Sequence, residues 1–376
     1  MACKLLVPDS TYERIPKLIH MAMILTDSSA PEAQQLTRVA LAGLSHDHVH
    51  GAFKRLEKGD VVLIGIAESD QKLVQRYQKQ YQLPESIFYK SLKALLKQEK
   101  PDAVLAFNAI SEHLAVVEAC APAGVHVMVE KPLATTVKDA RRMAALAWDN
   151  NTFLLVNYET TWYASNQELD IMAKHRIAIG DIRRMTVHAG HQGLKEVRAS
   201  GEFTNWLTNP VKSGGGALMD FGCYGANLMT WLMQGQEPVS VMAITRQLRP
   251  EVYPEVDDDA SIILEYADAT GIIEASWNWP FPIKDLEVFG GTGYIQALDE
   301  YTLRTKTNGD QFYVTEEVEM LAHPYQDYLS YLVAVIKGEI HPDQDLSSLE
   351  NNLIVIRILE AARQSAREGR KVALAK

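Results

Sequence analysis

Five apolar runs, each about the length of a buried strand, alternate with amphipathic stretches between residues 37 and 158. The runs lie at residues 37–43, 61–67, 102–108, 125–130 and 153–158. Helical spacing of apolar residues is seen at 44–60, 71–81, 92–99 and 113–121. Strand and helix in alternation predict a parallel, doubly wound sheet with right-handed crossovers.

The pattern changes after residue 182, where longer stretches alternate apolar and polar positions. These stretches lie at 185–190, 239–246, 259–266 and 271–277, and residues 290–294 have the composition of a turn. A mostly antiparallel sheet with one open face is expected from such alternation. Helical spacing returns at 167–174, 325–337 and 349–367. The fold class expected is therefore α/β, a parallel sheet followed by an α+β domain with a large open sheet.

One apolar strand ends in a group of chemically useful residues, Glu130, Lys131 and Pro132. Ligands of open parallel sheets bind beyond the carboxyl ends of the strands, so Lys131 is expected where chemistry takes place. A proline restricts the residue before it to extended or turn conformations. The sequence leaves open whether the Lys131–Pro132 bond is cis.

The turn after the first strand is the expected phosphate site of a Rossmann fold, because a glycine there precedes a helix N-terminus. Gly43 is present, but Ser45 and His48 replace the second and third glycines of the dinucleotide fingerprint. Glu68 ends the second strand, where an acidic residue binds the ribose hydroxyls. A carboxylate there favours NAD over NADP. Capping of a helix N-terminus is the alternative role for Glu68.

Three histidines at alternate positions, His46, His48 and His50, raise the question of a metal. If residues 44–60 are helical, His46 and His50 share a face and His48 does not. No further ligand group with convincing spacing follows downstream. We therefore predict no metal and expect these imidazoles, His46 in particular, to line the cofactor cleft or cap the helix.

A glycine-rich loop at 213–216 leads to Asp220 and Tyr224. Glycines allow close approach of the backbone to a ligand or another segment. On one helix Asp220 and Tyr224 would share a face, where a carboxylate and a phenol can orient a substrate and move a proton. Helix capping by Asp220 and simple packing by Tyr224 are the alternative.

Composition narrows the classes of partner. The net charge of −11 argues against a general nucleic-acid or anionic-membrane binder. Cys3, Cys120 and Cys223 form no disulfide framework, which fits a reducing compartment. No apolar run is long enough to cross a bilayer. Residues 1–30 weakly resemble a secretory signal, so periplasmic export is the alternative to the cytoplasmic location that we expect.

Several motifs together resemble the Gfo/Idh/MocA family, which includes glucose–fructose oxidoreductase and inositol dehydrogenase. The motifs are Glu130-Lys131-Pro132 after an apolar strand, Asn157-Tyr158, Gly214-Gly215-Gly216 followed by Asp220, Gly222 and Tyr224, the turn at 290–294, and residues 365–372. The resemblance spans about residues 37 to 373 in the order of the family.

The resemblance implies three domains of the chain: an extension at 1–36, an NAD(P)-binding Rossmann domain at 37–158, and a substrate-binding and oligomerisation domain at 159–376. The C-terminal helix is expected to pack back on the Rossmann domain. A homodimer or homotetramer is expected, because the open face of the sheet needs a cover.

It also implies hydride transfer at a secondary alcohol of a sugar or cyclic polyol. By position, Lys131 matches the lysine near the nicotinamide and the reacting oxygen, and Asp220 matches the substrate-orienting acid. Tyr224 is the expected acid/base, with its phenolate stabilised by the Lys131 ammonium.

Further positions follow from the same resemblance. Asn108, His113 and Glu130 are expected at the cofactor, with Asn108 where Thr-Pro is frequent in the family. The substrate residues implied are Asn157, Tyr158 and Trp162. Glu159 stands where the family often has arginine, so the pocket is expected to carry a different charge.

Two other functions remain open on the sequence. A glycoside hydrolase that keeps NAD bound could oxidise and then re-reduce its sugar, as some relatives of this fold do. A dinucleotide-binding sensor without catalysis is the third possibility, against which the full set of Lys131, Asp220 and Tyr224 argues.

Overall fold

Six parallel strands form the first sheet, in the order β3-β2-β1-β4-β5-β6. The computed structural model describes residues 36–174 and 179–374. The strands are β1 (Thr37–Ala42), β2 (Val61–Ala67), β3 (Phe88–Tyr89), β4 (Ala103–Ala106), β5 (His126–Glu130) and β6 (Leu154–Asn157). This is the strand order of dinucleotide-binding sheets, and its crevice lies at the carboxyl ends of the paired strands β1 and β4, because the helices that follow these two strands pack on opposite faces of the sheet.

Helices connect these strands as the pattern predicts. They are α1 (Val49–Leu56), α2 (Gln71–Tyr81), α3 (Leu92–Gln98), α4 (His113–Cys120) and α5 (Val137–Asp149), with short 3₁₀ turns η1 (Glu85–Ile87), η2 (Ile110–Glu112) and η3 (Ala121–Ala123). Helix α2 has the predicted bounds because Asp70 caps its N-terminus and Gln82 ends it in the left-handed region, at φ 52°.

The first helix is shorter than predicted. It begins at Val49, because residues 43–48 form a turn in which the backbone N–H groups of Ser45 and His46 both donate to the Phe107 carbonyl oxygen, at 3.1 and 3.0 Å. His46 therefore precedes the helix. The expectation that His46 and His50 share a helical face was wrong.

Nine strands form the second sheet, in the order β14-β13-β12-β11-β7-β10-β9-β8-β15. They are β7 (Ile182–Gly190), β8 (Ser240–Arg246), β9 (Asp259–Glu265), β10 (Thr270–Ser276), β11 (Ile283–Gly290), β12 (Gly293–Ala297), β13 (Thr302–Thr307), β14 (Val314–Glu317) and β15 (Val372–Ala373). β7 and β10 pair in parallel, and the other pairs are antiparallel. The predicted fold class is confirmed, and the predicted turn joins β11 to β12.

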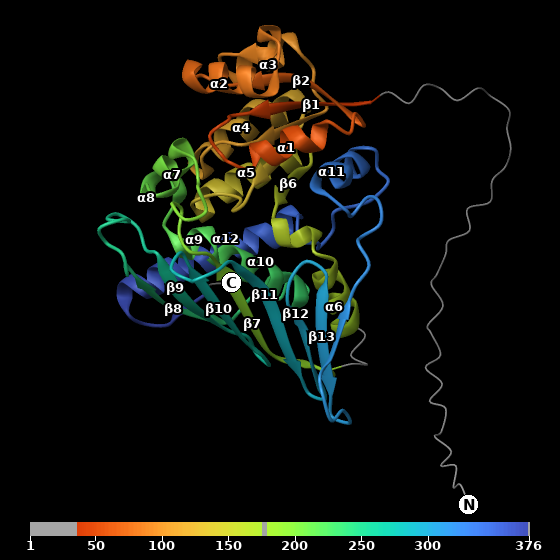
Figure 1. Cartoon of the computed structure of the whole chain (residues 1–376), viewed down its shortest axis with the longest axis vertical. Helices are drawn as coiled ribbons and strands as arrows, with labels where there is room; N and C mark the ends of the chain where they lie inside the picture. Colours follow the sequence, from red (N-terminus) through yellow and green to blue (C-terminus); the bar gives the residue numbers. More distant parts are fainter. Residues whose placement is uncertain (1–35, 175–178, 375–376) are drawn as a thin grey trace, which may run out of the picture. The chain divides into compact units, whose positions relative to one another are not determined.

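One face of this second sheet is covered by helices α10 and α12 (Figure 1). Residues of β9 alternate accordingly: Ala260, Ile262 and Leu264 are buried, while Ser261 and Ile263 are exposed. The remaining elements are η4 (Glu159–Trp162), α6 (Ala164–Lys174), α7 (Gly201–Leu207), α8 (Pro210–Ser213), α9 (Ala217–Asp220), α10 (Gly222–Leu232), α11 (Tyr328–Ile336) and α12 (Leu349–Glu368).

The C-terminal helices contact the first half of the chain. Leu329 and Leu332 of α11 share a buried cluster with Val39 and Leu41 of β1, and α12 packs along α5. Leu36–Lys376 accordingly form one compact unit. A domain boundary at 158/159 therefore stays a prediction.

Within the described residues, no helix is both long enough and apolar enough to span a membrane. The Lys131–Pro132 bond is cis. The extension proper and its weak resemblance to a secretory signal, at residues 1–35, lie outside the described residues.

Candidate active site

A buried ion pair joins the two halves of the chain. Lys131 follows β5, and its Nζ lies 2.5 Å from Oδ1 of Asp220 and 2.8 Å from the Asp220 carbonyl oxygen. The two side chains are only 6% and 8% exposed. Burial alone would raise the pKa of Asp220, but the Lys131 ammonium outweighs it and holds that pKa below its usual value. Burial would lower the pKa of Lys131, and Asp220 reverses that direction.

The position of Asp220 depends on a close approach of backbone segments. Asp257 accepts hydrogen bonds from the N–H groups of Gly216 and Leu218, at 3.0 and 2.7 Å. A Cβ atom on Gly216 would lie 1.7 Å from the Asp257 carbonyl oxygen, so only glycine fits there. Trp277 Nε1 then donates to Asp220 Oδ2 at 2.9 Å. The carboxylate is thus fixed at both oxygens.

Tyr224 lies beside this pair but on a different helix. Asp220 ends α9 and Tyr224 belongs to α10, so they do not share one continuous helix as expected. Lys131 Nζ lies 4.9 Å from the centre of the Tyr224 ring, over its face. Within residues 36–174 and 179–374, the Tyr224 hydroxyl makes no hydrogen bond to protein.

Burial is the main influence on the protonation of Tyr224. Burial, followed by the Glu159 carboxylate, raises its pKa well above the usual value. The Lys131 ammonium does not reverse this, because it is bonded to Asp220 and faces the ring. Tyr224 is therefore a phenol at neutral pH, and its role as acid/base beside Lys131 stays a prediction.

Lys284 and Glu159 also lie beside Tyr224, and the sequence analysis did not predict that they would meet there. Lys284, near the start of β11, forms an ion pair with Glu159 of η4. Lys284 Nζ lies 5.0 Å from the centre of the Tyr224 ring. The Glu159 carboxylate also accepts from the Tyr163 hydroxyl at 2.7 Å. The sequence analysis predicted an unusual charge at Glu159, whereas Lys284 stands in no motif that would indicate a functional role.

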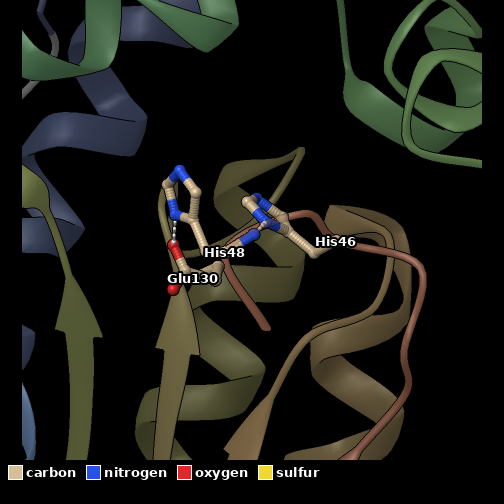
Figure 2. Close-up of side chains that lie close together, drawn as sticks. All are labelled: His46, His48 and Glu130. Atoms are coloured by element: carbon tan, nitrogen blue, oxygen red, sulfur yellow. Dashed lines mark hydrogen bonds and ion pairs between the residues drawn. The ribbon is translucent and has the colours of Figure 1, made fainter. Parts of the chain in front are cut away.

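Figure 2 shows how His46, His48 and Glu130 lie together at the end of β5. His48 Nδ1 is 2.8 Å from Glu130 Oε2, and candidate ligand atoms of the three residues all lie within 4.8 Å of one another. His50 is not part of this group, since its Nδ1 lies 2.5 Å from the Tyr81 hydroxyl.

Two imidazoles and a carboxylate are ligands that zinc or iron use. The hydrogen bonds here favour a different role. His46 Nδ1 accepts the backbone N–H of His48 at 3.2 Å, so the neutral ring carries its proton on Nε2. Burial, then His48 and Lys131, hold the pKa of His46 well below its usual value. We assign no metal to this group, in which His48 supports Glu130 through its hydrogen bond and His46 supports the backbone of His48.

The predicted substrate residues also take part in this support. Asn157 Nδ2 donates to Glu130 Oε1 at 2.9 Å, and Trp162 Nε1 donates to Asn157 Oδ1 at 3.0 Å. Tyr158 is fully buried, with its ring edge-on to Tyr224 at 5.5 Å between centroids. These three residues therefore hold Glu130 and Tyr224 in place, and Tyr158 has no surface open to a substrate.

A cavity of about 640 Å³ lies at the carboxyl ends of β1, β2 and β4. Its lining includes the predicted residues Gly43, Ser45, Glu68 and Asn108. Gly43 has φ +83°, and a Cβ atom there would lie 2.7 Å from Asn108 Cβ, so the tight turn needs glycine. The predicted residues His46, His113, Glu130 and Lys131 are outside this lining.

Glu68 lines the cavity but does not cap α2, whose N-terminus is capped by Asp70, and its role at the ribose stays a prediction. Its carboxylate accepts the N–H groups of Leu44 and Asp70, at 2.9 and 2.8 Å. It still faces the cavity, and burial raises its pKa. A carboxylate lining the far end of the cavity fits ribose hydroxyls and opposes a 2′-phosphate.

Two of the predicted cofactor residues each have a buried polar atom without a partner. Asn108 Oδ1 and His113 Nε2 have no hydrogen bond within the described part of the chain. His113 Nδ1 is held by the Leu133 carbonyl oxygen at 3.1 Å, and burial lowers the pKa of His113 to about 4. Buried polar groups are normally paired, so Asn108 Oδ1, whose residue lines the cavity, fits a polar group of a bound cofactor, whereas His113 is fully buried outside the lining.

The second half of the chain closes one wall of the cavity. Trp206 Nε1 of α7 donates to the Ser45 carbonyl oxygen at 3.1 Å. The backbone N–H of Ser200 donates to Asp47 Oδ2 at 2.8 Å, and the His46 ring packs against Phe203. Trp206 and Lys212 of this segment line the cavity itself.

Comparison with family models decides the class of protein. The model "Oxidoreductase family, NAD-binding Rossmann fold" matches residues 37–158, and the model "GFO/IDH/MocA C-terminal domain" matches residues 173–296. The chain belongs to the GFO/IDH/MocA family. It is an NAD-binding oxidoreductase, as the resemblance implied.

Individual relatives of this family member are distant. Trans-1,2-dihydrobenzene-1,2-diol dehydrogenase of Xenopus tropicalis is 27% identical over 67% of this chain and 72% of its own length. The Bos taurus protein of that name is 25% identical over 69% and 73%.

Solved structures of the family cover more of the chain. The aldose-aldose oxidoreductase of Caulobacter crescentus, complexed with glycerol, has a TM-score of 0.77 and 25% identity, covering 90% of this chain and all of that one. An inositol dehydrogenase homolog of Azotobacter vinelandii, complexed with NAD+, has a TM-score of 0.77 at 21% identity, covering 90% and 98%.

Proposed function

We propose that this oxidoreductase transfers a hydride between NAD and a secondary alcohol or ketone of a sugar or cyclic polyol. The observation that carries the proposal is the meeting of Lys131, from the first sheet, with Asp220 and Tyr224, from the second half, at the edge of the parallel sheet where its cofactor crevice opens. The relatives named above act on diols and aldoses, which supports this substrate class.

Lys131, Asp220 and Tyr224 have separate roles in this reaction. NAD, when bound in the crevice, supplies the hydride acceptor. The Lys131 ammonium, oriented by Asp220, stabilises negative charge on the substrate oxygen. Tyr224 donates a proton to that oxygen when a ketone is reduced and accepts it when an alcohol is oxidised. Because Tyr224 is a phenol at neutral pH, alcohol oxidation should accelerate as the pH rises.

The test combines binding and turnover. Calorimetry should show NAD binding in preference to NADP, and a panel of sugars and cyclic polyols should include a substrate that changes nicotinamide absorbance. Tyr224→Phe should reduce turnover about 10²- to 10⁴-fold with NAD affinity unchanged. The proposal fails if no member of the panel reacts, or if Tyr224→Phe retains full turnover.

One observation favours a second candidate, the glycoside hydrolase that retains NAD. The wall that Trp206 and its neighbours add to the cofactor cavity would slow cofactor release. Mass spectrometry of the purified protein would detect copurified NAD. Release of sugar from a glycoside without net formation of NADH would select this function over a simple dehydrogenase.

The proposal includes the assembly and the compartment. The open face of the second sheet exposes Ile244 and Ile263, which a second copy would cover to form a homodimer or homotetramer. Light scattering would test this, with a monomer as the contradicting result. Free, buried Cys120 and Cys223 fit the cytoplasm, which fractionation of cells would test.

A further inference from the structure

The Lys284–Glu159 ion pair lies against the aromatic ring of the proposed acid/base. Lys284 pairs in register with Ala189 of β7, on the helix-covered side of the second sheet. Glu159 comes from the 3₁₀ turn that follows β6 and is fixed by the Tyr163 hydroxyl. The Lys284 side chain is 19% exposed and that of Glu159 is 46% exposed, so solvent and substrate can reach the pair.

Tyr224 thus has two ammonium groups over its ring, at 4.9 Å for Lys131 and 5.0 Å for Lys284. Each is paired with a carboxylate, Asp220 in one case and Glu159 in the other. The two pairs come from different elements. A substitution in the Lys284–Glu159 pair therefore leaves the hydrogen bonds of Asp220 in place, whereas a substitution of Lys131 does not.

Besides Glu159 and the two lysines, the described charged or titratable groups at Tyr224 include Cys223, Asp220 and Glu130, together with Tyr158, whose ring is edge-on to it at 5.5 Å. Cys223 and Asp220 lie on α10 and α9, and Glu130 ends β5. All three are buried. The Glu159 side chain is 46% exposed, whereas Asp220 and Glu130 are buried, so the Lys284–Glu159 pair is the one whose charge can be changed here without leaving a buried charge unpaired.

We propose that Lys284 and Glu159 are positioning residues whose opposite charges set the pH at which Tyr224 changes between phenol and phenolate. This rests on the proposed function, in which that change is the proton step of hydride transfer. The pair holds Tyr224 as a proton donor near neutral pH, and either charge alone would displace that balance.

Substitutions of the two partners are expected to shift the pH midpoint of Tyr224 ionisation in opposite directions. Glu159→Gln removes a negative charge and leaves the Lys284 ammonium unneutralised, so the phenolate gains stability and the midpoint falls. Lys284→Met removes the positive charge and leaves the Glu159 carboxylate uncompensated, so the midpoint rises. A shift of about one pH unit in each direction is expected for charges at this range. The double variant should return close to wild type.

The experiment measures the Tyr224 midpoint in two ways on the full chain. The first is the pH profile of kcat and kcat/KM for oxidation of the best panel substrate with NAD. The second needs no turnover: a difluorotyrosine at position 224, which ionises at lower pH than tyrosine, is followed by ¹⁹F NMR during titration. Glu265→Gln and Lys371→Met, which break an exposed ion pair of 2.7 Å elsewhere on the second sheet, are the matched controls.

Opposite shifts in the two single variants, with recovery in the double variant, would support the proposal. Shifts of the same sign, or lower activity with unchanged midpoints, would show that the pair only holds structure and would overturn it. If no sugar or polyol reacts but the ¹⁹F midpoints move in opposite directions, the proposed substrate class fails while the charge control of Tyr224 stands.

Discussion

Two ion pairs flank Tyr224, and they differ mainly in their contact with water. Lys131 and Asp220 are 6% and 8% exposed, whereas Lys284 and Glu159 are 19% and 46% exposed. The first pair links the two halves of the chain, and its carboxylate is also bonded to Trp277. The second pair lies at the edge of the site. Two ion pairs at similar distances from one ring can therefore have different roles. The buried Lys131–Asp220 pair holds the site together, and the partly exposed Lys284–Glu159 pair changes the protonation of Tyr224.

The physical reason is the cost of an unpaired charge. Removing one partner of a buried pair leaves a charge without water or counter-ion, which costs about 3–5 kcal/mol. An exposed pair is screened by solvent and contributes about 0–1 kcal/mol. Three predictions on the two pairs and their partners test this contrast, and a fourth tests the cost of burying a charge at His113.

The largest effect is expected for Lys131→Met. It leaves Asp220 buried without its ammonium, so the free energy of unfolding should fall by about 3–5 kcal/mol, and turnover should be lost with it. Urea unfolding and steady-state kinetics measure the two quantities. A loss below 1 kcal/mol would mean that the buried pair behaves like a surface pair.

Acid should destabilise the buried region through His113. Its pKa is about 4 in the folded chain, below the usual 6.5, because burial disfavours the imidazolium. The folded state thus binds fewer protons between these values, and stability should fall as pH drops from 6.5 toward 4, by about 3 kcal/mol at about 1.4 kcal/mol per pKa unit.

His113→Gln provides the comparison, because its amide can still donate to the Leu133 carbonyl oxygen. Thermal unfolding across this pH range should be less steep in that variant. Equal slopes for both proteins would show that other groups cause the acid sensitivity.

Trp277→Phe should have an intermediate effect. It keeps most of the buried aromatic volume but removes the donor to Asp220 Oδ2, so stability should fall by about 1–3 kcal/mol. The Michaelis constant for NAD should not change, because the residue lies away from the cofactor cavity. An unchanged free energy of unfolding would show that Asp220 needs only Lys131.

The smallest effect on stability is expected for Lys284→Met. Because the pair is partly exposed, the free energy of unfolding should fall by less than about 1 kcal/mol. Urea unfolding of this variant beside Lys131→Met gives the direct comparison. A loss of 3 kcal/mol or more would place both pairs in the same structural class.

The sequence predicted those features that short-range patterns encode. Buried parallel strands are continuous apolar runs, and Asp70 and Gln82 mark both ends of α2. Lys131, Asp220 and Tyr224 were recognisable because each stands in a motif beside prolines or glycines with a backbone role, as Gly216 shows.

Features that depend on contacts between distant segments could not be predicted. Lys284 sits in an alternating strand, where a lysine normally faces solvent, and nothing nearby indicates Glu159 as its partner. The Trp206 indole meets Ser45 across 161 residues of chain. The direction of the Tyr224 pKa also depended on burial, which the motif does not report.

Helices α7 and α8 form one wall of the cofactor cavity, which makes the two halves of this chain dependent on one another for recognition of the nucleotide. Because Trp206 and Lys212 come from the second half yet line the nucleotide cavity, a chimera that joins this Rossmann half to another partner would lose part of its own cofactor site. Successful exchange of halves between such enzymes would therefore require residues 200–213 to travel together with the first 158.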